Sequence, residues 1–124
     1  MKSFYWETLG TGNINLILIH GWGFNSQIWF FIIKEFSSFC KIYLIDLPGH
    51  GKNKNLPNME IDEIVQKLRV TIPKNSIWIG WSIGGLIASR FALLYPKYVL
   101  GIITISSSPC FILKKNGLEF KKNK

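Results

Sequence analysis

One stretch of the chain limits the possible folds more than any other. Residues 76–81 form a mostly apolar run of strand length, and Gly80 and Gly84 flank Ser82 in a Gly-x-Ser-x-Gly pattern. Apolar residues at helical spacing follow, until Tyr95-Pro96 ends the pattern: Ile83, Leu86, Ile87 and Phe91. The stretch therefore predicts a strand that passes through a sharp turn directly into a helix.

Such a turn has a chemical use at Ser82. A serine at this position is held in a strained backbone conformation, and its hydroxyl lies above the sheet edge, at the positive end of the helix. The residues two before and two after it come too close together for side chains, a demand that Gly80 and Gly84 meet. Negative charge on an attacked carbonyl would be stabilised there. We predict that Ser82 is a nucleophile; the alternative is a chance match to the pattern.

Composition indicates one folded domain. The chain has 124 residues, of which 48% are hydrophobic and 15% aromatic, a content that argues against disorder. No apolar run approaches the roughly 18 residues of a membrane span, and residues 1–10 lack the hydrophobic region of a secretory signal. We therefore predict a cytoplasmic location and no membrane partner. Cys40 and Cys110 are expected to be reduced thiols rather than a disulfide.

The net charge of +8 raises the question of a nucleic-acid partner. The last eleven residues hold five lysines and one glutamate, so half of that charge lies at the end of the sequence. The other lysines form no basic stripe and have no aromatic platform beside them, so we predict no nucleic-acid binding. We expect residues 1–112 to form the domain and residues 113–124 to form a Lys-rich, disordered tail.

Strand-like and helical patterns alternate along the whole sequence. Apolar runs at 15–19, 41–45 and 99–105 are typical of buried strands, and residues 2–8 indicate an edge strand that enters a hairpin turn at 10–13. Asn25-Ser26 can cap a helix that extends to Phe36, and Asn58 can cap a second helix with one apolar face. This alternation predicts an α/β fold, with a mostly parallel sheet and helices on its faces.

The polar motifs follow the ends of the predicted strands. Residues 20–23 (His-Gly-Trp-Gly) come after the first parallel strand, residues 46–51 (Asp-Leu-Pro-Gly-His-Gly) after the second, and Ser82 after the third. The carboxyl ends of parallel strands share one edge of a sheet, where such folds bind their ligands. We expect the three motifs to meet there.

These motifs, in this order, resemble the first half of an α/β-hydrolase. More narrowly, residues 20–23, 77–86 and 107–111 resemble the pimeloyl-[acyl-carrier protein] methyl ester esterases of biotin synthesis, and the similarity covers residues 4–112. The resemblance implies that Ser82 is the nucleophile. It also implies that the backbone N–H groups of Trp22 and Ile83 hold the oxyanion, although Trp22 could serve packing alone.

The resemblance assigns structural roles to four other candidates. His20 and His50 are strand-end and loop residues in this family rather than catalytic bases. Asp46 is expected to fix a loop rather than to act as a triad acid. Cys110 is expected to be a packed thiol rather than a second nucleophile, because nothing beside it would lower its pKa.

The other two triad members have no candidate in the sequence. In this fold an Asp or Glu and then a His follow the serine, but no histidine follows Ser82 and the only later carboxylate is Glu119. We therefore expect the N-terminal half of an α/β-hydrolase fold, truncated after the sixth strand and inactive by itself. A serine hydroxyl is a weak nucleophile until a base takes its proton.

By resemblance, the function is hydrolysis of the methyl ester of pimeloyl-[acyl-carrier protein]. The implied partners are an acyl carrier protein that carries the ester and a separately encoded C-terminal half; no cofactor and no metal are implied. Two alternatives stay open. The chain could belong to another α/β-hydrolase that acts on an ester or thioester, or it could be a non-catalytic remnant or interaction module.

Overall fold

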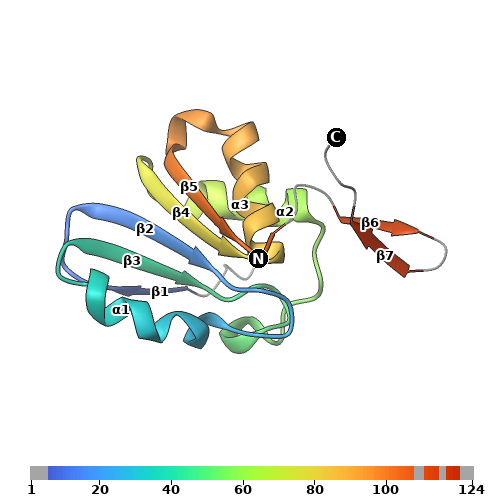
Figure 1. Cartoon of the computed structure of the whole chain (residues 1–124), viewed down its shortest axis with the longest axis horizontal. Coiled ribbons are helices and arrows are strands. Elements are labelled where there is room, and N and C mark those ends of the chain that lie inside the picture. Colours follow the sequence, from blue (N-terminus) through green and yellow to red (C-terminus); the bar gives the residue numbers. More distant parts are fainter. Residues whose placement is uncertain (1–5, 108–110, 115–116, 121–124) are drawn as a thin grey trace.

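A computed structural model describes residues 6–107 and the backbone of residues 111–114 and 117–120. Five strands form one sheet in the order β1-β3-β2-β4-β5 (Figure 1). Strands β2, β3, β4 and β5 are parallel, and β1 is antiparallel to β3. Their bounds are β1 Trp6–Leu9, β2 Ile14–Ile19, β3 Cys40–Ile45, β4 Ser76–Trp81 and β5 Val99–Ile105. The predicted α/β class with a mostly parallel sheet is confirmed.

Helices lie on both faces of this sheet (Figure 1). The short helix α1 (Phe30–Phe36) continues from a 3₁₀ turn, η1 (Ser26–Trp29), and packs on one face. The opposite face is covered by α2 (Ile61–Thr71) and α3 (Ile83–Leu94). Two further 3₁₀ turns complete the connections, η2 (Gly51–Asn53) after β3 and η3 (Pro96–Tyr98) before β5.

Successive side chains of the central strands point to opposite faces of the sheet, so the protein has two separate hydrophobic cores. In β2, Ile17 and Ile19 face α2 and α3, whereas Leu16 and Leu18 face α1. All four side chains are buried, which explains why the strand reads as a continuous apolar run. On the α3 side the ring of Trp78 stacks on Phe91 with centroids 4.3 Å apart, and both rings are fully buried.

Two local expectations are wrong. Residues 10–13 do not form a hairpin: the Thr11 N–H donates to the Ser37 carbonyl at 3.0 Å, and the chain then enters β2, while β1 pairs with β3. Asn58 does not cap α2, because the residue before the helix is Glu60, which makes no capping hydrogen bond with its side chain. The Asn25 cap does form, with its side-chain oxygen accepting from the Gln27 N–H at 2.9 Å, but it caps η1.

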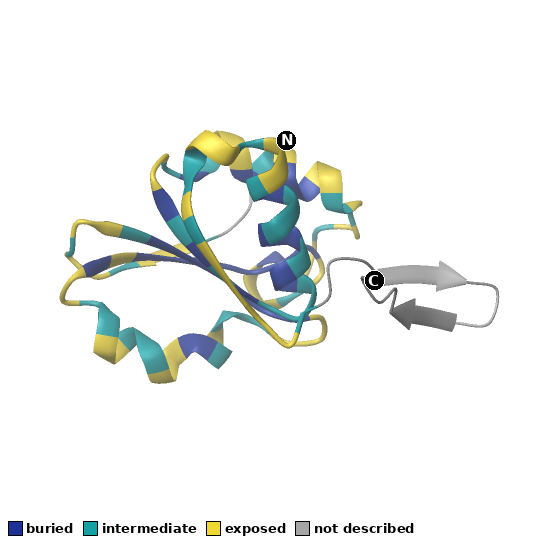
Figure 2. Ribbon diagram, turned by 45° about the horizontal axis from the view of Figure 1, so that its top comes forward, coloured by how far each residue is buried: buried dark blue, intermediate teal, exposed yellow. Residues whose placement is uncertain are grey.

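Strand β5 has the apolar pattern of a strand that is interior in a complete fold, but in this chain, which offers no following strand, we expected an exposed hydrophobic edge; most of β5 is exposed (Figure 2). Among the described residues β5 pairs only with β4, and Leu100, Ile103 and Ile105 are 67%, 51% and 43% exposed. Beyond it, β6 (Phe111–Lys114) and β7 (Gly117–Phe120) pair with each other in a second, two-stranded sheet. The boundary expected at residue 112 falls within β6, and the division into a domain and a tail stays a prediction.

An unpaired apolar edge offers backbone groups and hydrophobic side chains to a second molecule. We expect Ile103→Lys on β5 to reduce concentration-dependent self-association, measured by analytical ultracentrifugation. The matched control is Leu93→Lys, since Leu93 is 76% exposed but lies on helix α3. Equal effects of the two substitutions would show that added charge, and not the strand edge, controls association.

Candidate active site

Ser82 lies on a strained turn between β4 and α3. Its φ of 56° and ψ of −120° lie in a region that residues other than glycine rarely adopt. The Ser82 N–H donates to the Ile105 carbonyl at 2.8 Å, and the Ser82 carbonyl accepts from the Ser107 hydroxyl at 2.8 Å and the Gly85 N–H at 3.0 Å. The turn is therefore held by the end of β5 as well as by its own helix.

The two glycines of the motif are required for different reasons. A Cβ at Gly80 would overlap the Gly84 carbonyl, so the turn itself excludes a side chain there. A Cβ at Gly84 would overlap the Ile19 carbonyl and lie 2.7 Å from the His20 carbonyl. Because Gly84 has no side chain, the first turn of α3 can approach the carboxyl end of β2.

Three groups at this edge of the sheet have no hydrogen-bond partner within the described part of the chain. They are the Ser82 hydroxyl, the Ile83 N–H at the start of α3 and the Trp22 N–H on the loop after β2. The first N–H groups of a helix lack intrahelical acceptors, and the helix dipole adds positive potential there. The arrangement offers a nucleophile next to donors that could stabilise an oxyanion.

The imidazole of His50 fixes the loop that carries Trp22. Its Nε2 accepts from the Gly23 N–H at 2.9 Å, and its Nδ1 lies 2.9 Å from the Pro48 carbonyl. These partners assign a neutral ring that carries its proton on Nδ1. The Trp22 ring also meets His50 edge-on, with centroids 4.6 Å apart. Since both nitrogens are occupied, His50 is a loop residue, as expected.

His20 is engaged in the same way inside the protein. Its Nε2 accepts from the Leu47 N–H at 3.0 Å, and its Nδ1 donates to the Gly21 carbonyl at 2.7 Å. The side chain is fully buried, and this burial lowers the pKa of His20 below its usual value. A neutral ring with no free nitrogen cannot accept a proton from Ser82.

Asp46 connects the loops after β2 and β3 through its carboxylate. Oδ1 accepts from the Ser26 N–H at 2.8 Å and Oδ2 accepts from the Lys52 N–H at 2.9 Å. Oδ1 also lies 3.9 Å from Nε2 of His20. The Asp46 side chain is buried, and its bonds are to the backbone, so the expectation that it fixes loops is confirmed.

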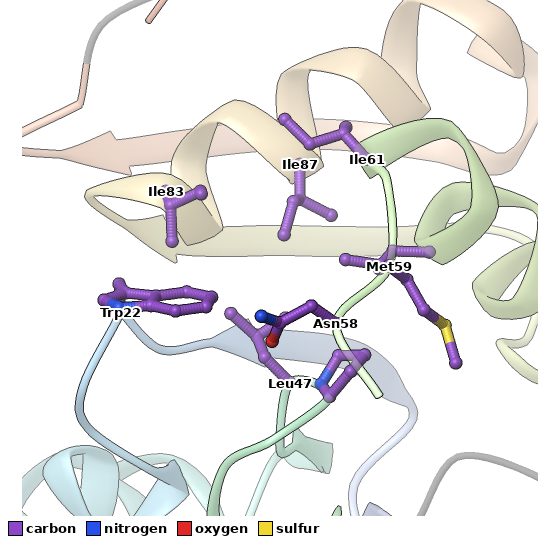
Figure 3. A pocket seen from close by; sticks show the side chains of 9 residues that line it. Trp22, Leu47, Asn58, Met59, Ile61, Ile83 and Ile87 are labelled. Atoms are coloured by element: carbon purple, nitrogen blue, oxygen red, sulfur yellow. The ribbon is translucent and has the colours of Figure 1, made fainter. Parts of the chain in front are cut away.

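A small, mostly apolar pocket opens beside these groups (Figure 3). Its cavity volume is about 50 Å³, well below the range of about 300–1,000 Å³ that is usual for ligand pockets. It is formed by the loop after β2, the loop after β3, the segment before α2 and the first two turns of α3. Its lining consists of Trp22, Leu47, Pro48, Asn58, Met59, Ile61, Ile64, Ile83 and Ile87.

Comparison with known proteins accounts for this geometry. The family model of the alpha/beta hydrolase fold matches residues 14–122. The chain belongs to the α/β-hydrolase fold family. A strained serine between a strand and a helix, with donors on the neighbouring loop, is the arrangement that this family uses for its nucleophile.

The chain also matches curated proteins over most of its length. It is 47% identical to a Wigglesworthia glossinidia brevipalpis protein over 122 residues, which are 98% of this chain and 47% of that protein. It is 44% identical to a Yersinia pseudotuberculosis protein over 111 residues, 90% of this chain and 43% of that protein. Both are named pimeloyl-[acyl-carrier protein] methyl ester esterase. The chain thus spans about half the length of these relatives.

Solved structures show the same architecture. A carboxylesterase structure from the thaumarchaeon Nitrososphaera gargenis aligns with a TM-score of 0.78 at 30% identity, covering 90% of this chain and 44% of that one. A marine microorganism esterase aligns with the same TM-score at 23% identity, covering 92% and 46%, and supports the fold alone. Both alignments agree that this chain corresponds to about half of an α/β-hydrolase fold.

Several site features were not predicted from the sequence. The roles of His50 and Ser107 depend on hydrogen bonds between distant segments, and no local pattern marks Asn58, Met59 and Ile61 as pocket residues.

Cys40 is a buried free thiol whose pKa is raised by burial, whereas Cys110 lies outside the described residues. In the described part of the chain, no helix is long and apolar enough to cross a bilayer, and no three His, Cys, Asp or Glu side chains gather as metal ligands.

The approach of α3 to β2 can be tested by adding one methyl group. We expect Gly84→Ala to lower the free energy of unfolding by about 3 kcal/mol, because the added methyl group would overlap the Ile19 carbonyl at the end of β2. Urea denaturation followed by circular dichroism measures the effect. The matched control is Gly101→Ala on β5, where a Cβ would meet nothing within 4 Å. Equal losses in the two variants would contradict the proposed contact.

The lowered pKa of His20 predicts a pH dependence of stability. Below a pH of about 6.5 the unfolded chain binds a proton that the folded chain does not, so the free energy of unfolding falls as the pH decreases. The slope contributed by one group is at most about 1.4 kcal/mol per pH unit. We expect urea titrations between pH 7.5 and 5.5 to show this loss, and His20→Gln, which does not titrate, to show a smaller slope. An unchanged slope in the variant would contradict the prediction.

Proposed function

We propose that this chain provides the nucleophile and oxyanion groups of a serine esterase that cleaves carboxylic esters through an acyl-enzyme. One observation carries the proposal. Ser82 combines a positive φ with an unbonded hydroxyl at the start of α3, next to a loop whose Trp22 N–H is also unbonded. Such a serine presents its oxygen to a substrate above the sheet.

In the proposed reaction, Ser82 Oγ attacks the carbonyl carbon of the ester and loses its proton to a base. The carbonyl oxygen becomes an oxyanion, which accepts hydrogen bonds from the Ile83 and Trp22 N–H groups. Collapse of this intermediate breaks the bond to the alcohol, which leaves with a proton. Water then attacks the acyl-enzyme, releases the carboxylic acid and regenerates the Ser82 hydroxyl.

The base is the component that this chain does not supply in our proposal. The sequence has two histidines, His20 and His50, and both use both ring nitrogens for other hydrogen bonds. We propose that the base and its carboxylate come from a separate polypeptide segment equivalent to the second half of the relatives, which are about twice as long. By itself, the 124-residue chain is then inactive.

The proposed substrate is the methyl ester of pimeloyl-[acyl-carrier protein]. The two relatives carry this name, and the mostly apolar pocket beside Ser82 suits the hydrocarbon part of such an ester. The corresponding partner is an acyl carrier protein, and the reaction would place the chain in biotin synthesis in the cytoplasm. The test also separates two alternatives: the substrate is another ester or thioester, or the chain is a non-catalytic module.

The test joins residues 1–107 of this chain to the second half of the Wigglesworthia relative. We expect the chimera to hydrolyse p-nitrophenyl butyrate at least 10³-fold faster than its Ser82→Ala variant, since loss of the nucleophile removes the acyl-enzyme route. We expect the 124-residue chain to be no faster than its own Ser82→Ala variant. Initial rates measured by absorbance decide both points.

The outcomes distinguish the candidate functions. Hydrolysis of pimeloyl-[acyl-carrier protein] methyl ester, followed by mass spectrometry, supports the proposed substrate. A chimera that cleaves only p-nitrophenyl esters indicates a different α/β-hydrolase. A chimera that folds but shows no Ser82-dependent hydrolysis contradicts the proposal and favours a non-catalytic module. Ser82-dependent turnover by the 124-residue chain would show that a base exists within it.

A further inference from the structure

The chain bends where β5 ends, beside the turn that follows β4 (Figure 1). Ser106 has a φ of 47°, in the left-handed region that residues other than glycine rarely adopt. Before this bend the Ile105 carbonyl accepts from the Ser82 N–H at 2.8 Å, and after it the Ser107 hydroxyl donates to the Ser82 carbonyl at 2.8 Å. The end of β5 therefore binds both backbone polar groups of Ser82.

The first turn of helix α3 leaves room for Ser107. A Cβ at Gly85 would lie 2.6 Å from both Cβ and Oγ of Ser107, so a side chain there would push Ser107 away. The strained residue Ser106 and the missing side chain at Gly85 thus serve the same hydrogen bond. Strained backbone persists where the surrounding structure fixes it, and it is found most often at functional sites.

The Ser107 hydroxyl acts on the peptide group that joins Ser82 to Ile83. The N–H of this group is that of Ile83, which has no acceptor within the described part of the chain. Because a peptide group is planar, a bond that fixes its carbonyl also fixes the direction of its N–H. Hydrogen bonds in a chain polarise one another, so a donor to the carbonyl also makes the N–H a stronger donor. The carbonyl also accepts from the N–H groups of Gly85 and Leu86 at 3.0 and 3.3 Å, and the hydroxyl is closer than either.

From this geometry we propose that Ser107 is a positioning residue for the oxyanion site. Its hydroxyl orients the peptide between Ser82 and Ile83 and strengthens the Ile83 N–H as a donor to the oxyanion. The oxyanion role of that N–H rests on the proposed function, but the effect of Ser107 on the peptide does not. The benefit is greatest in the transition state, where negative charge develops on the ester oxygen. Loss of the hydroxyl should therefore lower kcat and leave KM nearly unchanged.

Ser89 provides a matched control on helix α3. Its hydroxyl also donates to a backbone carbonyl at 2.8 Å, that of Gly85, and it is half-buried like Ser107. The peptide that Ser89 contacts carries the Leu86 N–H, which already has an acceptor. Ser89→Ala and Ser107→Ala each remove one hydroxyl and one hydrogen bond of equal length. We expect similar losses of stability in urea denaturation, and a loss of kcat in Ser107→Ala alone.

The catalytic test uses the chimera described above, in which Ser107 is the last residue from this chain. With p-nitrophenyl butyrate, we expect Ser107→Ala to lower kcat roughly tenfold, less than the loss of about 10²–10³-fold that follows outright removal of an oxyanion donor. KM should stay within about twofold of its original value. Ser107→Thr, which keeps the hydroxyl, should restore most of kcat, and Ser89→Ala should leave kcat unchanged.

A second test uses the full 124-residue chain and needs no turnover. In ¹⁵N-labelled protein, we expect Ser107→Ala to move the Ile83 amide proton signal upfield, because a less polarised peptide leaves this proton more shielded. Ser107→Thr should return the signal towards its original position, and Ser89→Ala should leave it in place. Comparison of the two alanine variants keeps the test decisive if the threonine variant does not fold.

Two results would overturn the inference: equal changes of kcat in Ser107→Ala and Ser89→Ala, or an Ile83 amide signal that Ser107→Ala does not move. Its failure is distinguishable from failure of the proposed function. An inactive chimera together with a shifted Ile83 signal would remove the esterase and leave the effect of Ser107 on the peptide standing. An active chimera whose kcat and Ile83 signal do not respond to Ser107→Ala would do the reverse.

Discussion

The contact between the start of α3 and the end of β2 positions everything else at the candidate site. With no side chain at Gly84, the helix backbone lies against the carbonyls of Ile19 and His20. This approach carries Ser82 and the Ile83 N–H to the loop after β2, where Trp22 lies. The proposed oxyanion role of the Ile83 and Trp22 N–H groups requires both to reach one oxygen, so an outward displacement of the helix by the width of a methyl group would weaken it.

Hydrogen-bonded polar side chains, two of them buried, hold the other side of this contact. His20, His50 and Asp46 each use their acceptor atoms on backbone N–H groups of neighbouring loops, so each buried polar atom that they contribute is compensated. A neutral imidazole suits this purpose because one ring nitrogen donates while the other accepts. Since these bonds link the loops after β2 and β3, the backbone around Trp22 is held in place, which the proposed oxyanion role of the Trp22 N–H requires.

The sequence predicts those parts of the fold that depend on local pattern. Three parallel strands are predicted by local patterns: the apolar runs at 15–19 and 41–45 and the stretch before Ser82. Their order along the chain places three motifs at one edge of the sheet. The pairing of β1 with β3 is not predicted, because turn residues at 10–13 indicate a reversal but not which distant strand receives the chain. The pocket is not predicted either, because it combines four segments that no periodicity connects.

The described residues contain the groups that we propose for the nucleophile, the oxyanion donors and the pocket, but no free base. The proposed oxyanion donors and the pocket both depend on β2, β4, α3 and the loops between them. Proton transfer needs a base with a free nitrogen or oxygen near Ser82, and burial together with two hydrogen bonds keeps His20 neutral and occupied. Oxyanion contacts and binding alone retain on the order of 10³–10⁴-fold acceleration over water when triad residues are missing from an otherwise intact enzyme.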